Sequence, residues 1–156
     1  MRTVGELLRA KRASEDDAVR RDRVESAMPM DTVLDAAKRM NDLRIGAVVV
    51  VERDNDGGTV AGILTERDIL TRVVAAGRDP SKTRVADVMT DRVIACTPDS
   101  SLAEVRKVVR EKRIRHVPVV DEQRLVGMVS IGDLNLADQH ALTETIETLE
   151  AYIRQA

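Results

Sequence analysis

The chain has 156 residues, and its 25 basic and 27 acidic side chains leave a formal net charge of -2. This balance gives no electrostatic case for a nucleic-acid partner, and no run of about 18 apolar residues occurs that could span a membrane. A single Cys excludes an intramolecular disulfide, and with two His it cannot build a usual zinc site without carboxylates or a second chain. We expect a cytoplasmic protein with no nucleic-acid, membrane or metal partner.

The first 23 residues form a segment ahead of the main body. Residues 1–12 carry Val4, Leu7 and Leu8 at helical spacing and predict a short helix. This stretch lacks the apolar core of a signal peptide. Residues 13–23 are dense in charges of both signs, which is typical of an exposed linker.

An internal repeat occupies most of the remaining chain. The matched segments are 24–29 with 93–98, 33–40 with 102–109, 44–52 with 113–122, and 60–68 with 125–133. The second pair has apolar residues at helical spacing, and the third is a β-branched run typical of a buried strand. Each copy therefore predicts strand, helix, strand, strand, helix, and the fold class is α/β.

These patterns divide the chain into five segments. They are the helix and linker at 1–23, a repeat at 24–80, a connection at 81–92, a repeat at 93–140, and a helix at 141–156. Gly77 can end the helix predicted over 66–76, and a short helix is predicted over 84–90.

The carboxyl-terminal segment predicts an amphipathic helix. Its apolar stripe consists of Leu142, Ile146, Leu149 and Ile153. A stripe of this kind must bury its apolar face against the body or against another chain.

Each repeat closes with a glycine, two apolar residues, a hydroxyl residue and, three positions later, an aspartate. The two sequences are Gly62-Ile63-Leu64-Thr65-Glu66-Arg67-Asp68 and Gly127-Met128-Val129-Ser130-Ile131-Gly132-Asp133. With two such motifs in register, the chain resembles the cystathionine-β-synthase (CBS) domain family over about residues 2–155. Its terminal segments TVGELLRAK and IETLEAYI are similar to those of small stand-alone bacterial CBS-pair proteins.

The resemblance implies a specific architecture and function. Two repeats would pack through their sheets with pseudo-two-fold symmetry and form a flat homodimer. Clefts at their junction would bind an adenosine-containing ligand (AMP, ADP, ATP, S-adenosylmethionine or NAD(H)), with no covalent cofactor. The module would be regulatory and would signal to an unknown partner protein.

An alternative of another class stays open, namely a dimerisation or protein-interaction scaffold with the same fold, empty clefts and functional terminal helices. The sequence contains no Gly-x-Ser-x-Gly elbow, no phosphate-binding Gly-Lys-Ser/Thr loop and no Cys-x-x-Cys pair. We therefore expect a protein that is not an enzyme.

Two interpretations of Thr65–Asp68 and Ser130–Asp133 stay open. A hydroxyl followed three residues later by an acid is the capping-box pattern of a helix amino terminus, here with Asp in place of Glu or Gln. The resemblance implies that each carboxylate accepts hydrogen bonds from two ribose hydroxyls, and charge-assisted bonds are about twice as strong as neutral ones. Both can hold at once, and occurrence at two matched places favours ligand binding.

Basic residues near the motifs are candidates for phosphate contacts. Arg67 lies within the first motif, and its counterpart in the second is Gly132, so the two clefts are chemically unequal. The resemblance places Arg115 and His116 at the phosphates of the cleft built on the other repeat. A solvated loop and a structural histidine are the alternatives, because charge runs are usually surface features.

The ligand's base is expected against aliphatic side chains and backbone, because the chain has no Trp or Phe. The resemblance assigns this role to Ile45, Gly46 and Pro118, and Gly46 lacks the Cβ that would keep a base from the backbone. Cys96 lies on a predicted strand beside a cleft, where a small buried hydrophobe is favoured over a redox role.

Overall fold

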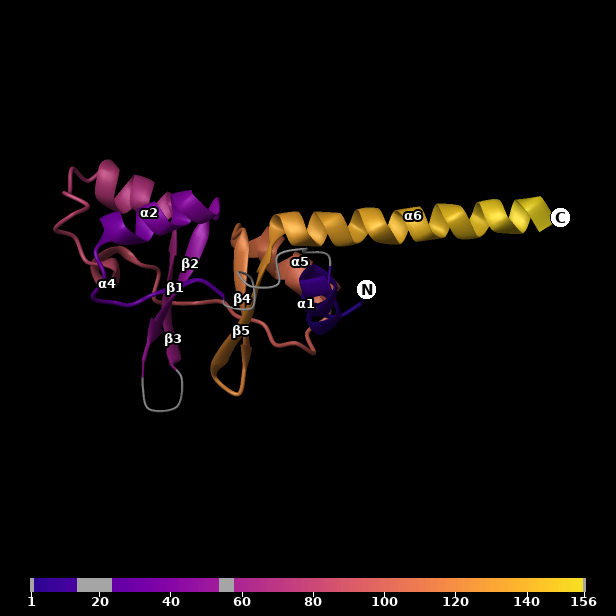
Figure 1. Ribbon diagram of the computed structural model, residues 1–156, viewed down its shortest axis with the longest axis horizontal. Coiled ribbons are helices and arrows are strands. Elements are labelled where there is room, and N and C mark those ends of the chain that lie inside the picture. The colour runs from indigo at the N-terminus through magenta and orange to yellow at the C-terminus, as the bar shows by residue number, and fades with distance from the viewer. Residues whose placement is uncertain (1, 14–23, 54–57, 156) are drawn as a thin grey trace.

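The structure is a computed structural model that describes residues 2–13, 24–53 and 58–155. Residues 14–23 of the linker predicted at 13–23, and the loop residues 54–57, lie outside this range. The elements are α1 (Val4–Ala13), β1 (Ser26–Ala27), α2 (Val33–Leu43), β2 (Ala47–Glu52), β3 (Thr59–Thr65), α3 (Glu66–Ile69), η1 (Leu70–Val74), α4 (Val85–Val88), α5 (Leu102–Lys112), β4 (His116–Asp121), β5 (Arg124–Ser130) and α6 (Ile131–Gln155). Helices pack against two β-hairpins, and α6 projects away from the body (Figure 1).

The helices α2 and α5 begin and end in the same way, as the repeat predicts. The hydroxyl of Thr32 accepts a hydrogen bond from the Asp35 amide at 3.1 Å, and that of Ser101 accepts one from the Glu104 amide at 3.2 Å. Such caps satisfy amide groups that have no partner inside the helix. Each helix ends at an arginine in the left-handed region, with φ of 54° at Arg44 and 53° at Arg113.

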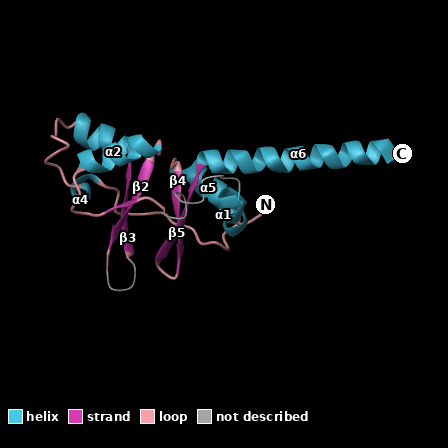
Figure 2. Cartoon of the chain, viewed as in Figure 1, coloured by secondary structure: helices cyan, strands magenta, loops and turns pink. Residues whose placement is uncertain are grey.

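The strands form a mixed sheet in the order β1-β2-β3-β5-β4. Both hairpins are antiparallel and carry a register shift at the matched place, between Val50 and Val51 and between Val119 and Val120. The hairpins lie side by side (Figure 2) and are joined in the ladder by one residue pair, Thr59 with Arg124. The two repeats therefore keep separate hydrophobic cores.

Each core is completed by a helix from outside its own repeat. Val4 and Leu7 of α1 are buried in the core of the second repeat, and Val85 and Val88 of α4 in that of the first. The backbone contacts are equivalent, because the Val4 amide donates to the Ser100 carbonyl at 2.9 Å and the Val85 amide to the Asp31 carbonyl at 2.9 Å. The segments 3–8 and 84–89 are therefore a further matched pair.

Two elements differ from the sequence prediction. The predicted strand at 93–98 is reduced to one bridge between Cys96 and Val119, whereas its counterpart forms β1. The helix of the second repeat does not stop near residue 140, because α6 runs unbroken from Ile131 to Gln155. No helix among the described residues is long and apolar enough to cross a membrane.

Candidate functional site

The motif carboxylate of the first repeat, Asp68, is buried and well satisfied by hydrogen bonds. Its Oδ2 accepts bonds from the Thr65 amide and hydroxyl, both at 2.9 Å, and the Thr65 hydroxyl accepts one from the Asp68 amide. Its Oδ1 accepts a bond from the Thr90 hydroxyl at 3.1 Å, and Arg72 Nη1 lies 3.8 Å away. The capping-box interpretation is thus confirmed here, and little acceptor capacity is left for a ligand.

The matched carboxylate of the second repeat, Asp133, retains more acceptor capacity. Its Oδ2 accepts bonds from the Ser130 amide at 2.7 Å and the Ser130 hydroxyl at 2.8 Å, so this motif is also a capping box. Lys11 Nζ lies 3.0 Å from the same oxygen. No described residue donates to its Oδ1, so this carboxylate can accept further bonds from a ligand.

The motif glycines are required because the helices that complete each core from outside its repeat, α4 and α1, pack directly on them. A Cβ on Gly62 would lie 2.6 Å from Met89 Sδ, and one on Gly127 would lie 2.6 Å from Leu8 Cδ1. These distances are well below ordinary van der Waals contact. The glycines therefore position α4 and α1, and α1 in turn brings Lys11 to Asp133.

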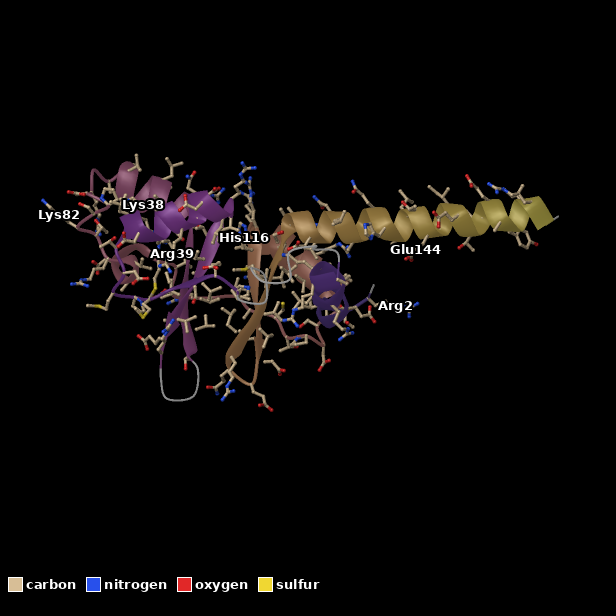
Figure 3. The ribbon with its side chains drawn as sticks, in the orientation of Figure 1. Arg2, Lys38, Arg39, Lys82, His116 and Glu144 are labelled. Atoms are coloured by element: carbon tan, nitrogen blue, oxygen red, sulfur yellow. The ribbon has the colours of Figure 1, made fainter. Side chains whose placement is uncertain are left out.

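At the junction of the repeats, His116 covers Gly46. A Cβ on Gly46 would lie 3.2 Å from His116 Cε1 and 3.5 Å from Glu66 Oε2. Figure 3 shows His116 at the start of β4, between the two halves of the molecule. Burial lowers the pKa of His116, and the negative charges of Glu66 and Asp133 oppose that shift. The imidazole therefore occupies space beside Gly46, where the resemblance places the ligand's base.

Beside the junction lies a strongly basic pocket of about 460 Å³. Arg67 of the first repeat lines it together with Arg115 of the second. Three arginines of the second repeat also line it, namely Arg106, Arg110 and Arg113. Sequence reasoning missed Arg106 and Arg110, although their spacing of four residues places them on one face of α5. Arg113, which ends that helix, belongs with Arg115 to the run of basic residues just before β4.

The charges of this pocket are largely uncompensated. Arg106 is the exception, because it pairs with Asp138 and donates to the Leu134 carbonyl at 3.2 Å. Across the described residues, the other four guanidinium groups have no carboxylate within ion-pair distance. Four unpaired cations around one hollow favour an anionic occupant.

Comparison with known proteins identifies the family of this fold. The CBS domain family model matches residues 17–75 and 85–139. The chain belongs to the CBS-domain family. It is 40% identical over 126 residues to the CBS domain-containing protein CBSX3, mitochondrial, of Arabidopsis thaliana. That match covers 80% of this chain but 61% of the Arabidopsis protein.

Solved CBS-domain structures share the fold. A putative signal-transduction protein with CBS domains from Burkholderia ambifaria is 37% identical, with a TM-score of 0.74 over 86% of this chain and 92% of that one. A hexameric CBS-CP12 protein from bloom-forming cyanobacteria is 31% identical, with a TM-score of 0.64 over 72% of this chain and 64% of that one. The tandem CBS architecture predicted from the two motifs is therefore confirmed.

The other expected ligand-binding residues of this CBS pair lie away from the pocket. Ile45 is half-buried and packs against the core of the first repeat. Pro118 is buried in β4 opposite Met128, and its carbonyl accepts a bond from the Cys96 amide at 2.9 Å. Of the ten predicted site residues, only Arg67 and Arg115 line the pocket, whereas Gly46 and His116 meet at the junction beside it.

Cys96 packs against the core of the second CBS repeat, as expected for a small apolar residue. Burial raises the pKa of its thiol to about 11, so the reactive thiolate is scarce at neutral pH. Among the described residues there is no group of three His, Cys, Asp or Glu side chains arranged to hold a metal ion.

Proposed function

We propose that this CBS pair is a regulatory module that binds a phosphorylated adenosine ligand at the junction of its repeats. The observation that carries the proposal is the convergence of Arg67 and Arg115, one from each repeat, on one pocket without carboxylate partners. Arginine forms bidentate hydrogen bonds to phosphate oxygens. A ligand held by both arginines would bridge the repeats, so its binding would change how they pack.

The ribose would bind at Asp133, whose Oδ1 is open to further hydrogen bonds. Asp68 would take the equivalent role in the first repeat only after its bond to Thr90 opens. We therefore propose unequal occupancy, with the cleft of Asp133 filled at lower ligand concentration. The base would take the space beside Gly46 after the His116 ring moves aside.

Thermal-shift titration with adenosine, AMP, ADP, ATP, NADH and S-adenosylmethionine tests this proposal. A ligand that binds only the folded state adds about 2.7 kcal/mol of stability at 100 times its dissociation constant. We expect saturable shifts that grow from adenosine to the phosphorylated ligands. The absence of any shift, with no adenine compound in the supernatant of denatured protein, would contradict the proposal.

Substitution of the two arginines separates phosphate binding from general stability. Arg67→Ala with Arg115→Ala removes two exposed side chains, so folding should be unaffected. Losing a hydrogen bond to a charged group costs about 1.5–3 kcal/mol, which corresponds to a loss of affinity of roughly 10–100-fold for ATP. Affinity for adenosine should not change, and Arg78→Ala, at an exposed arginine outside the pocket, is the control.

Signalling would require other polypeptides. The hexameric CBS-CP12 relative shows that a similar module assembles into an oligomer, and we propose that this chain forms a homodimer whose ligand state is read by a regulated protein. We also propose that it has no catalytic activity. Release of phosphate or adenine from AMP or ATP by purified protein would contradict that statement.

The scaffold alternative is favoured by one observation, the projecting apolar stripe of α6. Leu142, Ile146, Leu149 and Ile153 are between 48% and 72% exposed. A chain that assembles through this stripe but shows no thermal shift with any of the six ligands would be a scaffold with empty clefts.

A further inference from the structure

The helix α1 brings a positive charge to the carboxylate at which the proposed function places a ribose. Lys11 Nζ lies 3.0 Å from Asp133 Oδ2, and the Lys11 side chain is 40% exposed. Lys11 precedes the first residue that the CBS domain family model matches, residue 17. Exposed ion pairs contribute little to stability. The place of this lysine therefore has little value for folding alone, and its effect on a ligand has to be considered.

Lys11 reaches the carboxylate because α1 is longer than its counterpart α4. The two helices are matched over 3–8 and 84–89, but α1 continues to Ala13, whereas α4 ends at Val88. Lys11 lies in the additional part of α1. The second repeat therefore receives a cation from a stretch of helix that the first repeat lacks.

The cation beside the motif carboxylate of the first repeat has another task. Arg72 Nη1 lies 3.8 Å from Asp68 Oδ1 and donates to the carbonyls of Val88 and Met89 at 3.0 and 2.9 Å. These bonds hold the end of α4. The two clefts therefore differ in the cation that stands next to the ribose position, which is a lysine only in the second repeat.

The bonds to Asp133 also fix how its carboxylate is presented. The Ser130 amide, the Ser130 hydroxyl and Lys11 all bind Oδ2, at 2.7, 2.8 and 3.0 Å. Oδ1 accepts no bond from a residue that the structure describes. Because both oxygens belong to one carboxyl group, a ribose hydroxyl that donates to Oδ1 lies close to the ammonium group on Oδ2.

Lys11 belongs to the junction of the repeats and not to a remote surface. Burial lowers the pKa of His116, and the charges of Glu66, Asp133, Arg115 and Lys11 also act on it. All four charged groups therefore lie around the imidazole ring. The two carboxylates balance the two cations, so a ligand that uses Asp133 enters a site in which the charge of Lys11 is close.

The candidate ligands differ in the charge attached to the ribose. AMP, ADP, ATP and NADH carry a phosphate on the 5′ carbon, adenosine carries a neutral hydroxyl, and S-adenosylmethionine carries a sulfonium cation. A lysine ammonium group donates charge-assisted hydrogen bonds to phosphate and repels another cation. A lysine beside the ribose therefore separates these three kinds of ligand.

We propose that Lys11 determines the specificity of the cleft at Asp133, which accepts adenosine 5′-phosphates and rejects S-adenosylmethionine. The ammonium group donates to the carboxylate and to the phosphate attached to the ribose. The proposal rests on the proposed function, because it needs a ribose at Asp133. It goes further by naming the substituent that is selected and the residue, outside both repeats, that selects it.

The first experiment measures the affinities of the full chain for adenosine, AMP and S-adenosylmethionine by titration calorimetry. Lys11→Met should weaken AMP binding by roughly 10-fold or more, because a charge-assisted bond is lost. Adenosine binding should change by less than about twofold, and S-adenosylmethionine should bind more tightly than to the wild type. Lys11→Arg should keep the preference for AMP. Arg9→Met removes an exposed cation from the same helix and is the matched control.

The outcomes separate this inference from the proposed function. An equal loss of adenosine and AMP affinity in Lys11→Met would show that Lys11 only orients Asp133. Tighter AMP binding would show that Lys11 competes with the ligand for the carboxylate. Either result overturns the inference and leaves the proposed function intact. A wild type that binds none of the ligands, and releases no adenine compound on denaturation, would contradict both.

The second experiment assigns the effect to this cleft. Asp133→Asn keeps the shape of the side chain but removes the charge that accepts ribose hydroxyls, so the tighter AMP-binding event should be lost. Lys11→Met added to Asp133→Asn should then change the remaining affinity by less than about twofold. If the tighter event survives Asp133→Asn and still depends on Lys11, the ribose does not bind at Asp133 and the inference is wrong.

The third experiment varies the ionic strength, because salt screens the attraction between an exposed ammonium group and a phosphate. Between about 0.05 and about 0.5 M salt, AMP affinity should fall more steeply for the wild type than for Lys11→Met. Adenosine affinity should change little in either protein. A purely structural role of Lys11 would leave the two AMP profiles parallel, and that result would also overturn the inference.

Discussion

Lys11 Nζ lies 3.0 Å from Asp133 Oδ2, although the two residues are 122 positions apart in the chain. This ion pair fastens the end of α1 to the motif carboxylate of the second CBS repeat. The helix α4 has no lysine near Asp68, where the Thr90 hydroxyl donates instead. The two motif carboxylates therefore differ in their charged partner as well as in acceptor capacity.

Lys11→Met should lower the free energy of unfolding only modestly. The Lys11 side chain is 40% exposed, and pairs of this kind contribute about 0–1 kcal/mol. Leu7→Ala in the same helix should cost about 2–4 kcal/mol, because Leu7 is buried in the core of the second repeat. Urea unfolding measures both. If Lys11→Met were as costly as Leu7→Ala, the ion pair rather than apolar packing would hold α1.

Gly127→Ala should destabilise the chain, and Leu8→Ala should relieve part of that effect. The added methyl group would lie 2.6 Å from Leu8 Cδ1, and overpacking of this kind costs about 1–3 kcal/mol. A double-mutant cycle of the two substitutions measures the coupling, which we expect to exceed about 0.5 kcal/mol. Additive effects would mean that the motif glycine is not required by α1.

Gly62→Ala should cost more than Gly127→Ala. Its methyl group would meet the Thr90 carbonyl at 2.9 Å as well as Met89 Sδ. The Thr90 carbonyl accepts a hydrogen bond from the Ile63 amide, so it cannot move aside as the Leu8 side chain can. Thermal denaturation of the two single variants compares them, and equal losses would contradict this ranking.

Stability should fall as the pH drops below about 6.5, the usual pKa of histidine, because of His116. Burial lowers its pKa below the usual value of about 6.5, so the unfolded chain binds the proton first as the pH falls. The contribution is present above the unfolded pKa and is lost as the pH falls through the folded pKa. His116→Gln should make the melting temperature depend less steeply on pH over this range. An equally steep profile in the variant would assign the pH dependence to other groups.

Cys96 should react slowly with iodoacetamide at about pH 8. A thiol pKa of about 11 leaves little thiolate, and we expect alkylation on the order of 100-fold slower than for an exposed cysteine. Cys96→Ala with Ala151→Cys supplies that exposed thiol on the projecting part of α6. Mass spectrometry over time follows both proteins. Rapid alkylation of folded wild-type protein would contradict the raised thiol pKa and would favour a redox role.

Local patterns were sufficient to predict much of the fold. The β-branched runs became β2 and β4, the capped amphipathic runs became α2 and α5, and the two motifs formed their capping boxes. These features depend on side-chain periodicity and on hydrogen bonds between near neighbours, which one sequence determines. The helix of the second repeat was predicted to end at residue 140 only because the repeat ends there. No helix-stop signal supported that end, since no Gly or Pro follows Gly132 in α6.

The sequence by itself therefore determined the tandem CBS repeats, most of their order of elements, and the capping box at the end of each motif. Only the tertiary structure decided that α1 completes the second repeat and α4 the first, that Lys11 reaches Asp133, and that Arg67 and Arg115 share a pocket with three arginines of α5 and its carboxyl-terminal cap. The physical reason is that these contacts join residues far apart in the chain. Their geometry depends on how whole hairpins and helices pack, which no local period or capping signal encodes.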